Sequence, residues 1–138
     1  MDNQLSRLAV SKKIKYFLIV SFIGLGLFLR FYQLGKIPMG LSRDEASLGY
    51  NSWMISKTGR DEWEQLLPLH FRAFGEWKLP GYIYLSIPFI KLLGLNVFSV
   101  RILSALAGLA SAFVWYLIWL KKENKQTALL AGLLYLFS

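Results

Sequence analysis

The stretch ILSALAGLASAFVWYLIWL, residues Ile102–Leu120, runs for nineteen positions without a charge. A membrane-crossing helix needs about 20 mostly apolar residues, because the hydrocarbon core of a bilayer is about 30 Å thick. The whole chain of 138 residues is 55% hydrophobic and 16% aromatic. These features are typical of membrane proteins and predict an all-α chain that forms a polytopic helical bundle.

The same stretch carries small residues at helical spacing. Ser104, Gly108 and Ala112 are four residues apart, and Ala107 and Ser111 repeat the interval. Small side chains at this interval let a second helix approach closely. We therefore expect the transmembrane helix over residues 100–120 to pack against protein as well as lipid.

A first transmembrane helix is predicted over residues 16–34, after a basic N-terminal segment over residues 1–15. Four basic residues in that segment favour a cytoplasmic N-terminus and an external first loop. We expect Arg30, close to the end of the helix, to extend its charge to the membrane interface. A cleaved signal peptide is the alternative, because it also combines a basic start with an apolar core. No small-x-small cleavage site follows.

The stretch LPGYIYLSIPFIKLLGLNVF predicts a helix over residues 80–98 that either crosses the membrane or dips into it. Pro88 is expected to kink this helix. With three spans, the basic loop Lys121–Gln126 lies outside, against the positive-inside tendency; with two, it lies inside. We favour three spans and leave the side of that loop open. Residues 127–138 are apolar, but twelve residues cannot cross a bilayer. We therefore interpret them as the start of a fourth transmembrane helix that is truncated.

The loop over residues 35–79 has a different character from the apolar stretches. It holds six acidic and six basic residues, so it is neutral within a chain of net charge +8. The pattern Ser42-Arg43-Asp44-Glu45 is a capping box, which predicts a helix that begins at Arg43 and ends near Gly59. Its aromatic residues Tyr50 and Trp53 share one side, which favours an interfacial helix in the headgroup layer.

Composition also excludes several classes of function. The excess positive charge lies beside the apolar stretches, where it favours contact with membrane lipid, and no basic patch suggests a nucleic-acid partner. The chain has no cysteine, so it has no disulfide and no thiolate nucleophile. It also has no phosphate-binding P-loop, no dinucleotide-binding fingerprint and no Ser-x-x-Lys motif.

Three segments in order resemble the start of the membrane-embedded GT-C glycosyltransferases. They are GLSRDEASLGYNSWMISKTGRDEW after the first span, then KLPGYIYLSIPF, then NVFSVRILSALAGL. The chain is most similar there to the dolichyl-phosphate-mannose protein mannosyltransferase and aminoarabinose transferase group, glycosyltransferase family 39 and its relatives. The resemblance covers residues 31–138. One departure is that family members often have two prolines after the lysine, whereas Lys78 is followed by Leu79 and Pro80.

The resemblance implies roles for particular residues. It implies a carboxylate at the active site from Asp44 and Glu45, with Asp44 as the base, and a donor-phosphate partner in Lys78. Because the leaving phosphate is anionic, Arg72 is a second candidate for binding it. From the residues alone, Asp44 and Glu45 are better explained as acids that complement the helix dipole and complete the capping box. Lys78 and Arg72 are likewise explained as anchors for lipid headgroups.

The sequence therefore predicts a glycosyltransferase that moves a hexosyl or pentosyl group from a polyprenyl-phosphate donor to a lipid, glycan or protein acceptor on the outer face of the cell membrane. We expect no cofactor, although a divalent metal ion is not excluded by the sequence. A site of this kind needs several helices and loops, so we expect the 138 residues alone to be inactive. The alternative is a non-catalytic polytopic membrane protein, either a small helical subunit or part of a transporter.

The pair Asp61 and Glu62 and the single His70 are interpreted as residues without a catalytic or metal-binding role. Asp61 and Glu62 repeat the Asp-Glu pair after Gly59, and we interpret them as a solvated turn. His70 has no second ligand at metal-binding spacing, so we interpret it as a packed or interfacial residue.

Overall fold

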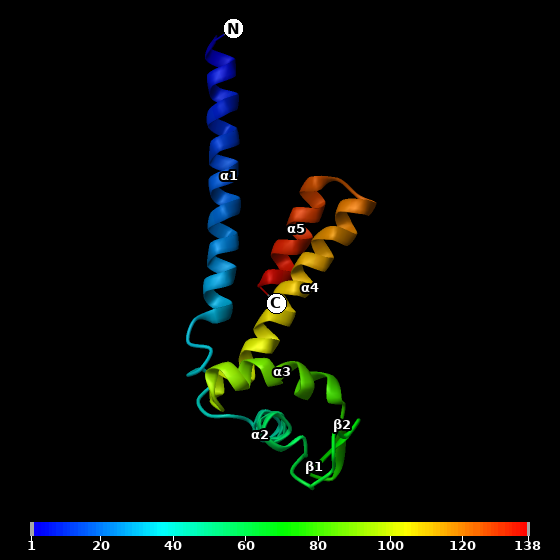
Figure 1. Cartoon of the computed structure of the whole chain (residues 1–138). Helices are drawn as coiled ribbons and strands as arrows, with labels where there is room; N and C mark the ends of the chain where they lie inside the picture. The colour runs from blue at the N-terminus through cyan, green and yellow to red at the C-terminus, as the bar shows by residue number, and fades with distance from the viewer. Residues whose placement is uncertain (1, 138) are drawn as a thin grey trace. The chain divides into compact units, whose positions relative to one another are not determined.

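The computed structural model describes the backbone of residues 2–137, together with the side chains of residues 13, 14 and 16–137 (Figure 1). The described residues form five helices and one two-stranded sheet. They divide into two compact units, one made of Met1–Tyr32 and Gly108–Ser138, the other of Gln33–Ala107. The prediction of an all-α fold class is thus confirmed, except that the chain also contains one short β-hairpin.

The first unit contains α1 (Asp2–Phe31), the later part of α4 (Val97–Lys122) and α5 (Lys125–Leu136). Helix α4 has 26 residues and a mean hydropathy of 1.9 over its most apolar window. At 1.5 Å per residue it is about 39 Å long, more than the thickness of a bilayer core. Among the described residues it is the one helix long and apolar enough to cross a membrane.

Small residues set the packing within this unit, as the spacing in α4 predicts. Ala112 of α4 is buried. A Cβ added at Gly132 of α5 would lie 3.5 Å from the carbonyl oxygen of Ala112 and 3.0 Å from the Cβ of Tyr116. A Cβ added at Gly26 of α1 would lie 2.5 Å from the Leu136 side chain. Helices α4 and α5 form the hairpin visible in Figure 1, and α1 also contacts α5.

Arg30 does not extend away from the protein as the sequence analysis expects. Its Nη1 lies against Gly108 of α4, and its Nη2 donates a hydrogen bond to the Leu136 carbonyl at 3.1 Å. The absence of a side chain at Gly108 leaves the space that the guanidinium fills. The expected snorkelling of Arg30 is therefore wrong for this structure.

Several boundaries differ from the prediction. The helix expected over residues 16–34 ends at Phe31, and its apolar part Tyr16–Phe31 is about 24 Å long, short of a bilayer core. The loop expected between α4 and α5 shrinks to two residues, because α4 continues to Lys122 and α5 begins at Lys125. Asn124 makes this possible: its Oδ1 accepts the first free N–H groups of α5 at 3.0 Å.

The second unit begins with α2 (Arg43–Thr58), whose bounds are those that the capping box predicts. Ser42 Oγ accepts the Glu45 N–H at 3.2 Å, and the Glu45 carboxylate accepts the Ser42 N–H at 2.8 Å. The helix stops at Gly59, which has φ of 72°, a left-handed conformation that glycine adopts without steric cost.

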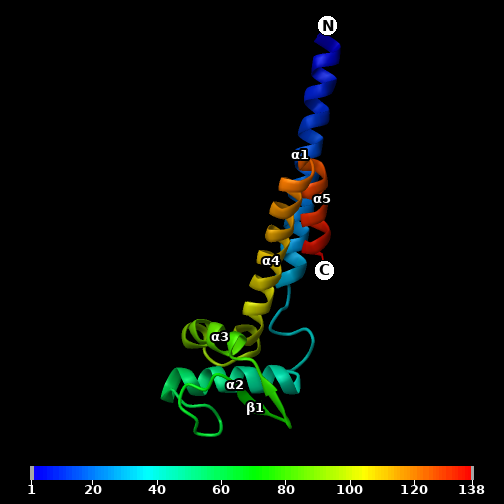
Figure 2. The same cartoon turned by 90° about the vertical axis from the view of Figure 1, so that its right-hand side faces the viewer.

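Helix α2 packs against α3 (Pro80–Leu93) with its small and polar face (Figure 2). Its buried positions include Gly49 and Ser52, and the Ser52 hydroxyl donates to carbonyls on both helices, Leu48 at 2.7 Å and Ile83 at 2.9 Å. Tyr50 stays exposed, stacked on Trp53 at 6.0 Å between ring centroids. The aromatic side is thus left uncovered within this unit.

Helix α3 is shorter than expected. It ends at Leu93, not near residue 98, because Gly94 takes a positive φ of 77°. Pro88 does not break it, since the helix is continuous from Pro80 to Leu93. Its 14 residues extend about 21 Å, so this element is too short to cross a bilayer as a straight helix.

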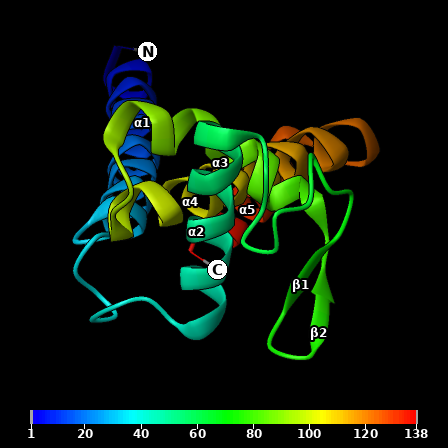
Figure 3. The same cartoon turned by 60° about the horizontal axis from the view of Figure 1, so that its bottom comes forward.

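Between α2 and α3 lie β1 (Phe71–Ala73) and β2 (Glu76–Lys78), an antiparallel hairpin (Figure 3). The turn residues Phe74 and Gly75 have φ of 50° and 86°, as in the primed turns that suit the twist of two-residue hairpins. Phe71 is buried with Ile55 of α2 and Ile83 of α3, and these three form the core of the unit. This core fixes the hairpin to both helices.

The interpretation of Asp61 and Glu62 as a solvated turn is wrong for Asp61, whereas Glu62 is exposed in a turn. The Asp61 side chain is buried, and its Oδ1 accepts the N–H groups of Trp63 and Gln65 at 2.9 and 2.8 Å. Glu62 is tied to Asn51 of α2 in both directions, at 3.0 and 3.1 Å. The pair fastens the loop after α2 to the helix itself.

Candidate active site

The candidate site is centred on the contact between Asp44 and Lys78. Asp44 lies in the first turn of α2 and Lys78 is the last residue of β2, and the Lys78 Nζ forms an ion pair with Asp44 Oδ1. A second carboxylate, Glu76, lies 3.6 Å from the same Nζ. The Asp44 side chain is 64% exposed, whereas that of Lys78 is 12% exposed. An accessible carboxylate thus meets a largely covered cation.

Lys78 is held in place by the elements on both sides of it. In the hairpin it pairs with Phe71, whose ring is buried in the core of the unit. Next in the chain, Leu79 is the N-cap of α3, and Pro80 fixes the first turn of that helix. The strand register and the start of α3 therefore fix the backbone from which the ammonium group projects.

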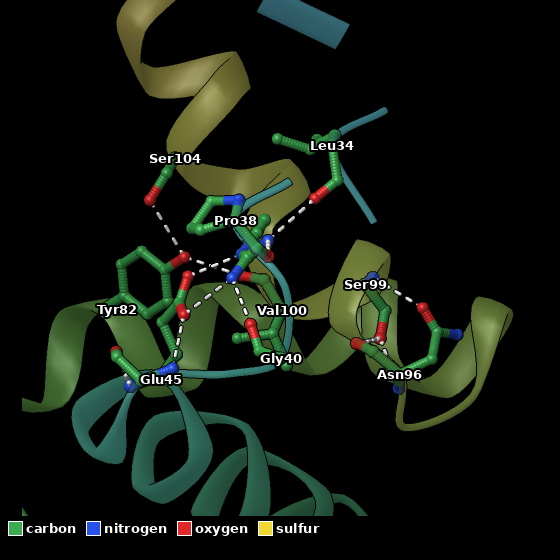
Figure 4. Close-up of polar contacts among 11 residues, drawn as sticks. Leu34, Pro38, Gly40, Glu45, Tyr82, Asn96, Ser99, Val100 and Ser104 are labelled. Atoms are coloured by element: carbon green, nitrogen blue, oxygen red, sulfur yellow. Dashed lines mark hydrogen bonds and ion pairs between the residues drawn. The ribbon is translucent and has the colours of Figure 1, made fainter. Parts of the chain in front are cut away.

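Arg101 in α4 contacts both Glu45 and the linker before α2, and its side chain is almost fully buried. Its Nε and Nη2 donate to the two carboxylate oxygens of Glu45 at 2.7 and 3.0 Å. Its Nη1 donates to the carbonyls of Leu34 and Pro38 at 3.2 and 2.9 Å, and Nη2 also donates to Gly40 at 2.6 Å. Figure 4 shows these three linker residues and Glu45 gathered at one point. Arg101 thus fixes the linker that precedes α2.

The Glu45 carboxylate is held by Arg101 and by the N-cap of α2. The hydrogen bonds from Arg101, reinforced by the Ser42 N–H, hold the pKa of the Glu45 carboxyl at about 2, against an ordinary value of 4.5, although burial opposes them. A carboxylate with such a pKa is a poor proton acceptor at neutral pH. Glu45 thus holds the cap and the contact with Arg101, and Asp44 remains accessible.

The first turn of α4 is itself fixed, which gives Arg101 a defined position. Ser99 and Asn96 form a reciprocal cap, with each side chain accepting the other's N–H at 3.1 and 3.0 Å (Figure 4). The Tyr82 hydroxyl of α3 donates to the Val100 carbonyl at 2.7 Å and lies 3.0 Å from Ser104 Oγ. Tyr82 thus ties α3 to the start of α4.

The structure does not bring Arg72 to the site. Neighbouring residues of a strand point to opposite faces, so Arg72 lies on the face of the hairpin away from Phe71 and its partner Lys78. There its guanidinium stacks over the Trp63 ring at 5.3 Å. His70 is exposed, and its ring contacts Trp77 at 4.8 Å between centroids.

The sequence analysis assigns no role to Arg101. One signal was available: the residue is a charge at the start of an apolar helix, where an ionisable side chain normally has a partner inside the protein. The identity of that partner was not available, because Glu45 is 56 residues away in the chain.

The arrangement offers two chemical capabilities. Asp44 can accept a proton, and the Lys78 ammonium can bind an anion as a point charge. Among the described side chains, residues 13, 14 and 16–137, no three of histidine, cysteine, aspartate or glutamate come together as metal ligands would. Comparison with known protein families, with curated proteins and with solved structures finds no match to this chain.

Proposed function

We propose that the protein is a membrane glycosyltransferase that uses a polyprenyl-phosphate sugar as donor, with Asp44 as general base and Lys78 as the partner of the donor phosphate. The observation that carries the proposal is the contact between the Lys78 ammonium and the Asp44 carboxylate. These residues are 34 positions apart, and the resemblance of the sequence to GT-C enzymes selects both of them independently of the structure.

The proposed reaction needs both of these groups close together. An acceptor hydroxyl attacks the anomeric carbon of the sugar, and its proton passes to the Asp44 carboxylate. The bond between the anomeric carbon and the phosphate oxygen breaks, and the bonding electrons leave with the polyprenyl phosphate. The Lys78 ammonium then stabilises the negative charge that develops on that phosphate. The acceptor is a lipid, a glycan or a protein.

The proposed setting is the outer face of the cell membrane, with several helices of the protein crossing the bilayer. Helix α4 has the length and hydropathy for a full span. The basic start of α1 favours an internal N-terminus, which puts the linker and α2 outside. Arg72 lies on the face of the hairpin opposite to Lys78, so we do not include it among the residues that bind the donor phosphate.

The experiment uses membranes of cells that express the whole gene product, because the 138 residues alone are expected to be inactive, and these membranes are supplied with a panel of polyprenyl-phosphate hexoses and pentoses. Release of polyprenyl phosphate is the readout, so the acceptor need not be known. Asp44→Asn should lower turnover by a factor of roughly 10²–10⁴, the usual contribution of a general base. Glu64→Gln is the matched control, since Glu64 is an exposed carboxylate of the same external loop. Equal turnover in both variants would refute the assignment of Asp44, and no release from any donor would argue for the non-catalytic alternative.

A further inference from the structure

Arg30 is a half-buried cation that has no part in the proposed reaction. Its Nη2 donates to the Leu136 carbonyl at 3.1 Å, while its Nε is buried without a hydrogen-bond partner. Among the side chains that the structure describes, none of the ion pairs includes Arg30. A buried guanidinium with an unsatisfied N–H is costly unless an anion reaches it.

There is space for such an anion beside the guanidinium. A cavity of about 270 Å³ is lined by Gly26, Leu29, Arg30, Leu136 and Phe137. All of these residues belong to α1 or to the end of α5, within one compact unit. Arg30 is the one charged residue of this lining and the other four residues have apolar side chains or none, so the cavity suits a single anionic group attached to an apolar body.

An apolar groove of about 740 Å³ adjoins that cavity, and Phe137 lines both. Its walls come from α1 and α5 and include Ile14, Leu18, Phe22 and Leu133. At 1.5 Å per residue, the groove extends about 12 Å from Ile14 to Phe22, and Arg30 lies about 12 Å beyond it on the same helix. A mostly apolar groove and a cavity that contains a cation thus lie next to each other along α1 and α5.

We propose that this groove and cavity together bind one anionic phospholipid, with the phosphate on Arg30 and an acyl chain along the groove. The chemistry is complementary at both ends: the phosphate oxygens accept the Nε hydrogen bond and offset the charge, and the chain covers the exposed leucines. Arg30 is at the last turn of an apolar helical segment, a place where arginine normally meets the headgroup layer. This site is separate from Asp44 and Lys78 and does not depend on the proposed reaction.

The test is native mass spectrometry of the full chain released from detergent micelles, titrated with phosphatidylglycerol or phosphatidylcholine. We expect one phosphatidylglycerol to bind more tightly than phosphatidylcholine. Arg30→Gln should weaken phosphatidylglycerol binding roughly tenfold, as loss of a charge-assisted hydrogen bond would. Arg30→Lys should keep part of the preference, and Lys36→Gln, which removes an exposed cation after the same helix, should leave it unchanged.

Three results would overturn the proposal. The first is equal affinity of the wild-type chain for the two phospholipids, a measurement that needs no variant to fold. The second is phosphatidylglycerol binding by Arg30→Gln as tight as that of the wild type, with helical content preserved by circular dichroism. The third is displacement of the phospholipid by an equimolar polyprenyl phosphate, which would assign the groove to the lipid of the sugar donor.

A Leu133→Trp variant, which narrows the groove, should weaken binding of long-chain phospholipid.

Discussion

The Glu45 carboxylate receives two N–H groups from Arg101, at 2.7 and 3.0 Å, while it also caps Ser42 at 2.8 Å. One carboxylate therefore joins the start of α2 to α4, and Arg101 adds the carbonyls of the linker between α1 and α2 to the same point. Asp44 is the residue just before Glu45, so the position of the proposed base depends on this pair.

Replacing Arg101 should destabilise the second unit more than the loss of an ordinary surface charge. Arg101→Gln leaves Glu45 and three linker carbonyls without their donor, and removal of one partner of a buried pair typically costs about 3 kcal/mol or more. Arg101→Lys should recover part of this stability, because it keeps the charge but not the forked geometry. Thermal unfolding in detergent is the measurement. Lys91→Gln, at an exposed position of α3, should change stability by less than about 0.5 kcal/mol.

The same pair predicts how stability depends on pH. The folded pKa of Glu45 is about 2, below the value of 4.5 expected for the unfolded chain. Its contribution is therefore fully present above about pH 4.5 and is lost as pH falls toward 2. We expect the melting temperature to fall across this window, with a smaller fall in Glu45→Gln, which has no carboxyl to titrate. An equally steep acid transition in Glu45→Gln would assign the pH dependence to other groups.

Local signals in the sequence were sufficient for α2, because a capping box and a glycine act on adjacent residues. The long-range contacts were not predictable in the same way. Asp61 is buried because its side chain bonds backbone N–H groups of its own loop, and no period in the sequence shows that. Glu45 and Arg101 were both visible as charges, but their pairing depends on how α4 returns to α2. The contact of Asp44 with Lys78 was anticipated only as a shared role, through the resemblance.

Gly49 should tolerate no side chain. A Cβ at this position would lie 2.6 Å from Val100 Cγ2, at the contact between α2 and the first turn of α4. We expect Gly49→Ala to cost about 1–3 kcal/mol through overpacking. Gly81→Ala is the matched control in α3, since a Cβ there meets nothing within 4 Å. That change should be neutral or stabilise the helix by up to about 1 kcal/mol. Similar melting temperatures for the two variants would contradict the close packing of α2 on α4.

The proposed orientation can be tested with single cysteines, because the chain has none of its own. Met39, in the linker before α2, is 96% exposed. If the linker is external, Met39→Cys should react with an impermeant maleimide in intact cells, while Ser6→Cys should react only after the membrane is opened. The reverse labelling pattern would place α2 and the candidate site on the cytoplasmic side.

The roles of Asp44 and Lys78 should separate in steady-state kinetics of the expressed protein. In the resting structure Asp44 holds the ammonium that the donor phosphate would need, so Asp44→Asn removes a competitor as well as a base. We therefore expect kcat to fall by roughly 10²–10⁴ while KM for the donor stays the same or decreases. Lys78→Met should act differently: KM for the donor should rise, because a phosphate partner is lost in the ground state, and kcat should fall, because the leaving group loses stabilisation. Lys78→Arg should restore part of both, since it keeps the charge. An increase in donor KM in Asp44→Asn equal to that in Lys78→Met would mean that the two residues only hold each other in place, and the assignment of Asp44 as a base would fail.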